Sequence, residues 1–189
     1  MTSILPVRRR RLYRCALGGT LFLVIGGLTA SWFVAGVLVA ANPRHVGKPP
    51  VDLNAVAFTV PSDSGSTISG WHTAPAHCDG VVILLHGIRG SRLSMLQRAR
   101  LLHAEGFATV MIDLQAHGES PGDAITLGHM EKHDVRAAVE FARRKHPRQP
   151  IGVIGVSLGG AAAVLASPLN IDAAVIESVY PDVDTAIHN

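Results

Sequence analysis

The sequence predicts an α/β domain with a mostly parallel sheet and flanking helices, incomplete at its carboxyl end and preceded by one transmembrane helix. Two observations predict this fold class. After residue 55, short β-branched apolar runs alternate with helical stripes, which argues for parallel strands with helices on both faces of the sheet. Before it, residues 15–41 form an uncharged run longer than the roughly 20 residues that cross a bilayer. The 189 residues suffice for one such domain.

The first 14 residues form a basic tail. Its five arginines precede any acidic residue, so the net charge of +3 belongs to this tail and the remainder of the chain is mildly acidic. They are Arg8, Arg9, Arg10, Arg11 and Arg14. A basic tail can bind nucleic acid, but an apolar run follows this one directly and no set of base-stacking aromatic residues accompanies it. We therefore expect contact with a membrane and none with nucleic acid.

The apolar run from Cys15 to Ala41 is interpreted as an uncleaved, single-pass anchor. A signal peptide is the alternative, although its apolar region usually spans only about 7–15 residues. The small side chains of Val39 and Ala41 would suit a signal peptidase, and cleavage there would release a secreted, soluble domain. Five arginines before the run, against Arg44 and Lys48 after it, predict a cytoplasmic amino terminus and an extracytoplasmic domain.

The remaining chain divides into a short linker and one domain. Residues 42–54 contain three prolines and are expected to form the linker, followed by the domain at 55–189. Segments 55–60 and 66–74 flank a turn rich in Ser, Gly and Asp and predict an antiparallel hairpin. The later elements then alternate as strand 80–87, a helix from Met95 to Gly106, strand 107–114, helix 133–145, strand 151–157, helix 158–167 and strand 171–178.

The candidate nucleophile is Ser157, in the G-x-S-x-G sequence Gly155-Val156-Ser157-Leu158-Gly159. This pattern alone is weak, and a strand-to-helix turn with an incidental serine is the alternative. Here it ends a buried strand and opens a helix, as a nucleophile elbow requires. The turn strains the serine backbone and lifts its hydroxyl above the sheet. Side chains two residues to either side would collide, so Gly155 and Gly159 are expected as the elbow glycines.

An attacking serine needs two hydrogen-bond donors for the oxyanion that it creates. The amide of Leu158, at a helix amino terminus, is one candidate. The second candidate is the amide of Ile88, in the loop His86-Gly87-Ile88 that follows strand 80–87. For His86 itself we expect a local hydrogen bond in preference to proton transfer.

Three segments, taken in order, resemble the α/β-hydrolase superfamily and, within it, the monoglyceride-lipase and serine-aminopeptidase-like branch. They are VVILLHGIRGS at 81–91, DLQAHGES at 113–120 and GVSLGG at 155–160. The resemblance covers about residues 55–180. It implies that His86 and Gly87 open the oxyanion loop, and that Asp113 and His117 have structural roles outside the catalytic triad.

The resemblance also implies residues that this chain lacks. The family's catalytic order is Ser, then Asp or Glu, then His, usually after a seventh and an eighth strand. The expected strands end at the sixth, so we expect a truncated fragment with impaired activity, whose acid and histidine lie beyond Asn189. Strand 171–178 would then be an apolar edge strand that favours aggregation. Four residues downstream of Ser157 are the candidate substitutes within this chain: Glu177, Asp182, Asp184 and His188.

These features predict a membrane-anchored serine hydrolase that cleaves a small acyl substrate, a carboxylic ester, thioester or peptide, through an acyl-serine intermediate. The alternative is a non-catalytic, membrane-anchored scaffold that keeps the hydrolase fold as an interaction surface. No cofactor or metal is expected. Cys15 and Cys78 are expected to form neither a disulfide nor a metal site, because they lie in separate segments outside any activating motif. The sequence does not indicate the oligomeric state.

Overall fold

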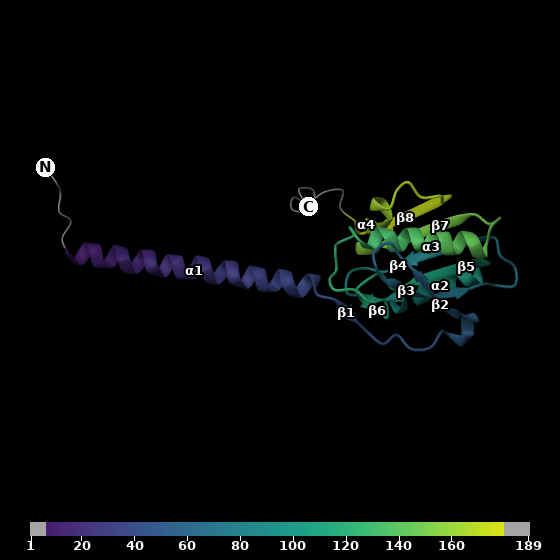
Figure 1. Ribbon diagram of the computed structural model, residues 1–189, viewed down its shortest axis with the longest axis horizontal. Helices are drawn as coiled ribbons and strands as arrows, with labels where there is room; N and C mark the ends of the chain where they lie inside the picture. The colour runs from purple at the N-terminus through teal and green to yellow at the C-terminus, as the bar shows by residue number, and fades with distance from the viewer. Residues whose placement is uncertain (1–6, 180–189) are drawn as a thin grey trace. The chain divides into compact units, whose positions relative to one another are not determined.

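The computed structural model describes residues 7–179 and divides the chain into two compact units, Met1–Val39 and Ala40–Asn189. Helix α1 (Val7–Val39) forms the first unit (Figure 1). Its segment Ala16–Val39 is long and apolar enough to cross a membrane, a test that a signal sequence also passes. Large apolar side chains of this segment are exposed, including Trp32 at 84%.

The second unit contains a six-stranded sheet in the order β2-β3-β5-β4-β7-β8. Strands β2 and β3 form an antiparallel hairpin that joins β5 antiparallel, whereas β5, β4, β7 and β8 are parallel to one another. The predicted α/β class with a mostly parallel sheet is therefore confirmed. The strand bounds are β2 (Val56–Pro61), β3 (Thr67–Thr73), β4 (Gly80–Leu85), β5 (Phe107–Ile112), β7 (Ile151–Val156) and β8 (Ala173–Glu177).

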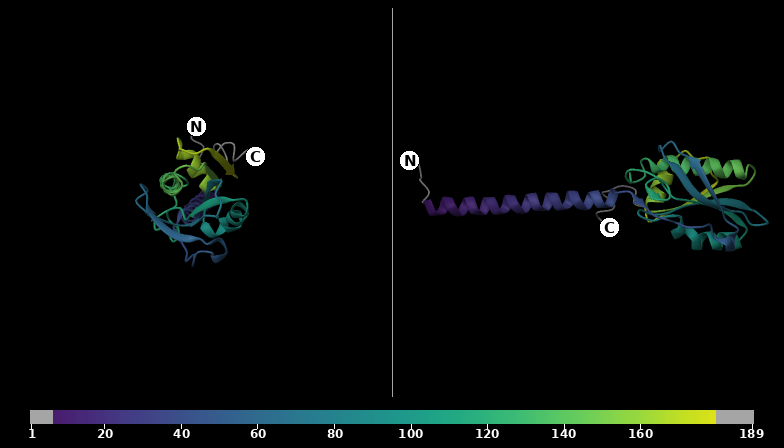
Figure 2. Two further views of the ribbon diagram at one scale, coloured as in Figure 1. Left: turned by 90° about the vertical axis from the view of Figure 1, so that its right-hand side faces the viewer. Right: turned by 60° about the horizontal axis from the view of Figure 1, so that its bottom comes forward.

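Helices cover both faces of this sheet (Figure 2). On one face lie the 3-10 turn η2 (Arg92–Met95) and helix α2 (Leu96–Ala104), and on the other lie α3 (Glu131–Lys145) and α4 (Leu158–Leu165). Each helix connects two parallel strands, which is why it crosses one face of the sheet. A second, two-stranded sheet pairs β1 (Asn42–Pro43) with β6 (His117–Gly118) in parallel.

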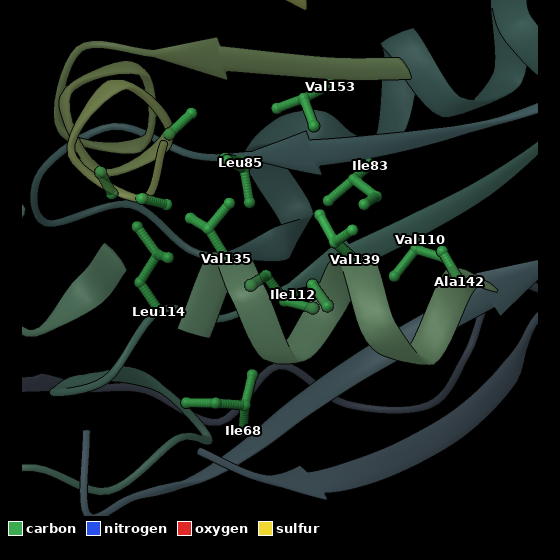
Figure 3. Packing of buried hydrophobic residues seen from close by; sticks show 14 of the residues in the cluster. Ile68, Ile83, Leu85, Val110, Ile112, Leu114, Val135, Val139, Ala142 and Val153 are labelled. Carbon is green, nitrogen blue, oxygen red and sulfur yellow. The ribbon is translucent and has the colours of Figure 1, made fainter. Parts of the chain in front are cut away.

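Alternate residues of each central strand point to opposite faces, so each strand contributes to two cores. In β4, Ile83 and Leu85 pack toward α3 and α4, whereas Leu84 packs toward α2. Figure 3 shows the first of these cores, where Val135 and Val139 of α3 meet the sheet. Full burial of such a side chain stabilises the fold by about 1.5–3 kcal/mol. The central strands are therefore a rigid platform for the loops at their carboxyl ends.

The segment expected to form a linker, 42–54, lies in the same compact unit as the sheet. Val46 and Leu53 are buried in the core beneath α2, and Leu53 ends a 3-10 turn, η1 (Val51–Leu53). At the far side of the sheet, β8 is an edge strand whose residues 173–176 are exposed.

Candidate active site

Ser157 lies in the turn between β7 and α4. Its φ of 49° falls in a region that L-residues rarely occupy, a conformation that costs about 1–3 kcal/mol and persists only where its surroundings enforce it. One such restraint is the hydrogen bond from its amide to the Glu177 carbonyl, 2.8 Å long. The side chain is half-buried, and among the residues that the structure describes its hydroxyl has no recorded hydrogen bond. The hydroxyl can therefore form a hydrogen bond or react with a bound molecule.

The two glycines that flank Ser157 occupy positions with no room for a side chain. A Cβ on Gly155 would lie 2.7 Å from the Gly160 Cα, and one on Gly159 would lie 2.6 Å from the Leu85 Cβ. Because backbone surrounds both positions, neither clash can be relieved by a side-chain rotation. The turn thus brings α4 against the ends of β4 and β7 at a distance that only glycine allows.

The loop after β4 lies directly beside the serine. A Cβ built on Gly87 would stand 3.6 Å from the Ser157 Cβ, and the amide of Gly159 donates to the His86 carbonyl at 3.1 Å. This hydrogen bond ties the start of α4 to the loop. The amide of Ile88 lies in this loop, and the amide of Leu158 lies at the start of α4. Neither amide donates a hydrogen bond to an acceptor within the described part of the chain. The loop that contains Ile88 therefore lies against the turn that contains Ser157 and Leu158.

Two buried histidines join the loop after β4 to the loop after β5. The His86 Nδ1 lies 2.8 Å from the Gly87 carbonyl, and its Nε2 accepts from the Leu114 amide at 3.1 Å. His117 mirrors this arrangement, because its Nδ1 donates to the Gln115 carbonyl and its Nε2 accepts from the Arg89 amide. A carbonyl only accepts and an amide only donates, so both rings are neutral and protonated at Nδ1.

Burial favours this neutral form of both histidines. It lowers the pKa of His86 to about 4, opposed by the hydrogen bond to Gly87. The same cause lowers the pKa of His117 below its ordinary value. The two rings meet edge to face, with centroids 5.0 Å apart. Neither ring contacts the Ser157 hydroxyl, and both act as connectors between loops.

An ion-pair network centred on the buried Arg92 also connects the loop after β4 to the loop after β5. Arg92 donates its backbone amide and its Nη1 to the Asp113 carboxylate at 2.6 and 2.9 Å, and its Nη2 binds Glu119. The guanidinium also lies over the Trp71 ring, 4.8 Å from its centroid. Burial raises the pKa of Asp113, while hydrogen bonds from the amides of Arg92 and Glu119 oppose that rise.

Among residues 7–179, no side chain that could act as a general base is hydrogen-bonded to the Ser157 hydroxyl. The Glu177 carboxylate, weighed as an acid, accepts a hydrogen bond from Arg98 Nη2 at 2.6 Å. Asp182, Asp184 and His188 lie outside the described residues. Within 7–179 no group of three or more His, Cys, Asp or Glu side chains is arranged to hold a metal, and Cys78 is a free thiol.

Sequence reasoning missed several residues that position the site. The sequence pattern assigns no role to Arg92 or Glu119. It places Asn42 in a linker, although the Asn42 side chain reaches the loop after β4. The position of Asp113 was the one sequence feature that could have indicated this network. A carboxylate directly after an apolar strand is expected to be buried, and a buried carboxylate requires hydrogen-bond donors. The identity of those donors depends on which loops the sheet brings together.

Comparisons with known proteins identify relatives of this chain. Residues 76–178, more than half of the chain, match the family described as serine aminopeptidase, S33. An uncharacterized protein of Bacillus subtilis, YqkD, is 32% identical over 125 residues, which cover 66% of this chain and 41% of the relative. The chain thus spans less than half the length of this curated relative.

Solved structures show the same fold. An esterase from Pyrococcus furiosus is 29% identical with a TM-score of 0.63, covering 71% of this chain and 55% of the esterase. A serine hydrolase without a lid from Xanthomonas campestris has a TM-score of 0.58 at 23% identity, covering 65% of this chain and 60% of that protein, and supports the fold alone. From the family match and the fold together, the chain belongs to the serine aminopeptidase S33 family of α/β-hydrolases.

Proposed function

We propose that this hydrolase-fold chain is a membrane-anchored serine hydrolase with Ser157 as its nucleophile. The observation that carries the proposal is the strained backbone of Ser157, with a φ of 49°, beside two amides that have no recorded acceptor in the described part of the chain. Strain of this kind gathers at functional sites. A turn that merely joined a strand to a helix would not require it.

The proposed chemistry is acyl transfer to the Ser157 hydroxyl. Its Oγ attacks the carbonyl carbon of the substrate, a base takes the hydroxyl proton, and the carbonyl oxygen becomes an oxyanion. The amides of Ile88 and Leu158 donate to this oxyanion, an interaction that commonly contributes about 3–4 kcal/mol per donor to catalysis. Loss of the alcohol, thiol or amine leaves an acyl-serine, which water hydrolyses to a carboxylic acid and the free enzyme.

The proposed substrates are small molecules with a carboxylic ester, thioester or peptide bond. The likeness to the Pyrococcus furiosus esterase favours esters among these three. The oxyanion donors contact only the reacting carbonyl, so the proposal concerns the type of bond that is cleaved.

The proposed location is a membrane, with the amino terminus in the cytoplasm and the hydrolase unit on the other side. The support is the 24-residue apolar segment Ala16–Val39, together with the arginines that precede it. The hydrolase unit would then act close to the bilayer, where esters of long-chain acids gather.

Labelling with a fluorophosphonate probe tests the nucleophile. The 189-residue chain is incubated with the probe with and without added imidazole, which supplies a base in solution. We expect labelling of Ser157 that imidazole accelerates, with no labelling of Ser157→Ala and normal labelling of the control Ser167→Ala. Equal labelling of wild-type protein and Ser157→Ala, or no labelling at any imidazole concentration, would refute the assignment.

The same experiment addresses the scaffold alternative. That alternative is favoured by one observation, the absence of a base in contact with Ser157 among residues 7–179. A scaffold would leave Ser157 unreactive even with imidazole present, while the fold, measured by circular dichroism, stayed intact.

A further inference from the structure

The segment that follows helix α1 is attached to the loops of the active site. Residues 42–46, called the strap below, run parallel to β6: the Asn42 amide donates to the Ala116 carbonyl and the Arg44 amide to the Gly118 carbonyl, both at 2.7 Å. Val46 is buried, and its amide donates to Glu119 at 3.1 Å. The strap therefore has a defined place on the hydrolase unit.

One side chain of the strap reaches the oxyanion loop. The Asn42 Nδ2 donates to the Arg89 carbonyl at 2.8 Å. Arg89 follows Ile88, the proposed oxyanion donor, and the amide of Gly90 closes this turn on the Gly87 carbonyl at 3.0 Å. Asn42 thus bonds to the Arg89–Gly90 peptide, whose N–H in turn donates to the carbonyl of the Gly87–Ile88 peptide that carries the proposed donor.

Arg89 needs this support because its backbone is strained. Its φ is 57°, in the left-handed region that favours glycine. Two hydrogen bonds from outside the turn hold it there: His117 Nε2 accepts from its amide, and Asn42 donates to its carbonyl. Asn42 and His117 are also register partners between β1 and β6. The paired strands β1 and β6 therefore hydrogen-bond to both peptide groups of Arg89, one through its N–H and the other through its carbonyl.

We propose that Asn42 is a positioning residue that sets the direction of the Ile88 amide, and that the strap is consequently part of the active site. The inference rests on the proposed function only for its catalytic consequence. Without the Asn42 side-chain amide, the turn relaxes toward negative φ at Arg89, and the Ile88 N–H leaves the position that it shares with the Leu158 N–H. Release of the strap would lower the reactivity of Ser157 without moving the serine.

Hydrogen exchange on the full chain in detergent micelles tests the structural part. Asn42→Ala removes the side-chain donor, and Asn42→Asp replaces it with a group of the same shape that only accepts. We expect exchange of residues 86–92 to accelerate by a factor of about 3 to 10 in both variants, as the loss of one hydrogen bond implies. Exchange of β7 should stay unchanged, and the control Lys48→Ala, an exposed residue beyond the strap, should behave as wild type.

The rate of fluorophosphonate labelling at Ser157 tests the catalytic part. In the presence of imidazole, we expect Asn42→Asp to slow labelling by a factor similar to the change in exchange, with no change in the melting temperature of the sheet. Unchanged exchange and labelling in both Asn42 variants would overturn this inference and leave the proposed function standing. A wild-type protein that never labels would overturn the proposed function, whereas the exchange result would still decide whether Asn42 holds the loop.

Discussion

Strained backbone gathers in the loops around Ser157. Arg89, Ala116 and Ser157 all have positive φ, and they come from the loop after β4, the loop after β5 and the turn after β7. Each conformation costs free energy that neighbouring hydrogen bonds must offset. These three turns are therefore held by hydrogen bonds from several neighbouring segments.

A methyl group at Gly159 should destabilise the fold. In Gly159→Ala the new Cβ would meet the Leu85 Cβ at 2.6 Å and the His86 carbonyl oxygen at 2.8 Å, and neither can move without shifting β4. Overpacking of this kind costs about 1–3 kcal/mol. Urea unfolding in detergent should show this decrease in the free energy of unfolding.

Gly152→Ala is the matched control on the same strand. Its Cβ would lie 3.8 Å from the nearest atom, the Ala173 carbonyl oxygen, which is ordinary contact. We expect this variant to unfold within about 1 kcal/mol of wild type. Equal losses in both variants would mean that the close approach at Gly159 does not constrain the turn.

The buried histidine His86 should make stability fall in acid. Its pKa is lowered to about 4 in the folded protein, while an unfolded chain protonates histidine near pH 6.5. Between these values the unfolded state binds more protons, so the free energy of unfolding decreases as pH falls, by about 3 kcal/mol for this group. Stability measured from pH 7 to 4 should fall less steeply in His86→Gln than in wild type. Parallel profiles would contradict the neutral buried ring.

Asp134 provides a contrast of opposite sign in the same pH range. Burial raises its pKa to about 6, against hydrogen bonds from Ser64, the Gln115 amide and Ser62. The folded state then binds more protons than the unfolded state between about pH 4 and 6, so this group makes stability rise as pH falls. Asp134→Asn should therefore steepen the acid loss that His86→Gln reduces.

At the level of helices and strands, buried polar side chains connect segments that lie far apart in the sequence, in addition to the apolar core that these segments share. Asp134 at the start of α3 accepts from Ser62 and Ser64 in the β2–β3 turn, at 2.7 and 2.6 Å. Glu131, one turn earlier, accepts from the Thr126 and Gly128 amides. Helix α3 thus fixes the turn before it and the hairpin, which explains why it begins at Glu131, two residues before the predicted start.

Arg92 of η2 likewise connects distant segments, because its guanidinium binds Asp113 and Glu119 in the loop after β5. Its replacement by Met should leave the buried Asp113 carboxylate without its charged partner, and breaking a buried ion pair in this way costs about 3–5 kcal/mol. Chemical unfolding of Arg92→Met measures this loss. Adding Asp113→Asn to Arg92→Met should recover part of it.

Arg100→Met is the control for Arg92→Met. Arg100 pairs with Asp52 at 2.8 Å, but both side chains are exposed, so solvent screens the pair. Its loss should leave the unfolding curve almost unchanged. A cost for Arg100→Met as large as that for Arg92→Met would show that burial does not set the strength of these pairs.

At the level of the whole molecule, the proposal that α1 is a membrane anchor can be tested directly. The chain should remain with membranes after alkaline carbonate extraction. Replacing both Leu23 and Leu28 by Lys should release it, since each lysine at the centre of a span costs about 2.5–3.5 kcal/mol. Leu101→Lys, at an exposed apolar residue of α2, should leave the protein in the membrane.

Intact mass decides between an anchor and a signal peptide. A soluble product whose sequence begins near Asn42 would contradict the anchor. Because the strap begins at Asn42, cleavage after Ala41 would keep the strap and its hydrogen bond to Arg89. The inference about the oxyanion loop can thus be tested in either form of the protein.

Features that depend on neighbours along the chain were predictable from the amino-acid sequence. The alternation of β-branched runs and helical stripes predicted six strands close to their observed positions, because these periodicities follow from backbone geometry. The elbow glycines and the apolar run were readable for the same reason. Ser157, Ile88 and Leu158 could be proposed as a site since their motifs end or follow strands whose carboxyl ends share one edge of a parallel sheet.

The contacts that hold those loops in place could not be predicted from the sequence, because they depend on how distant segments pack. The strand order places β4 between β5 and β7, so the loops after these strands meet, and alternation alone does not specify that order. Asn42 finds its acceptor 47 residues away at Arg89, and the Leu114 amide finds His86 across 28 residues. A buried donor must pair with some acceptor, but which one is available depends on the packing of the whole sheet.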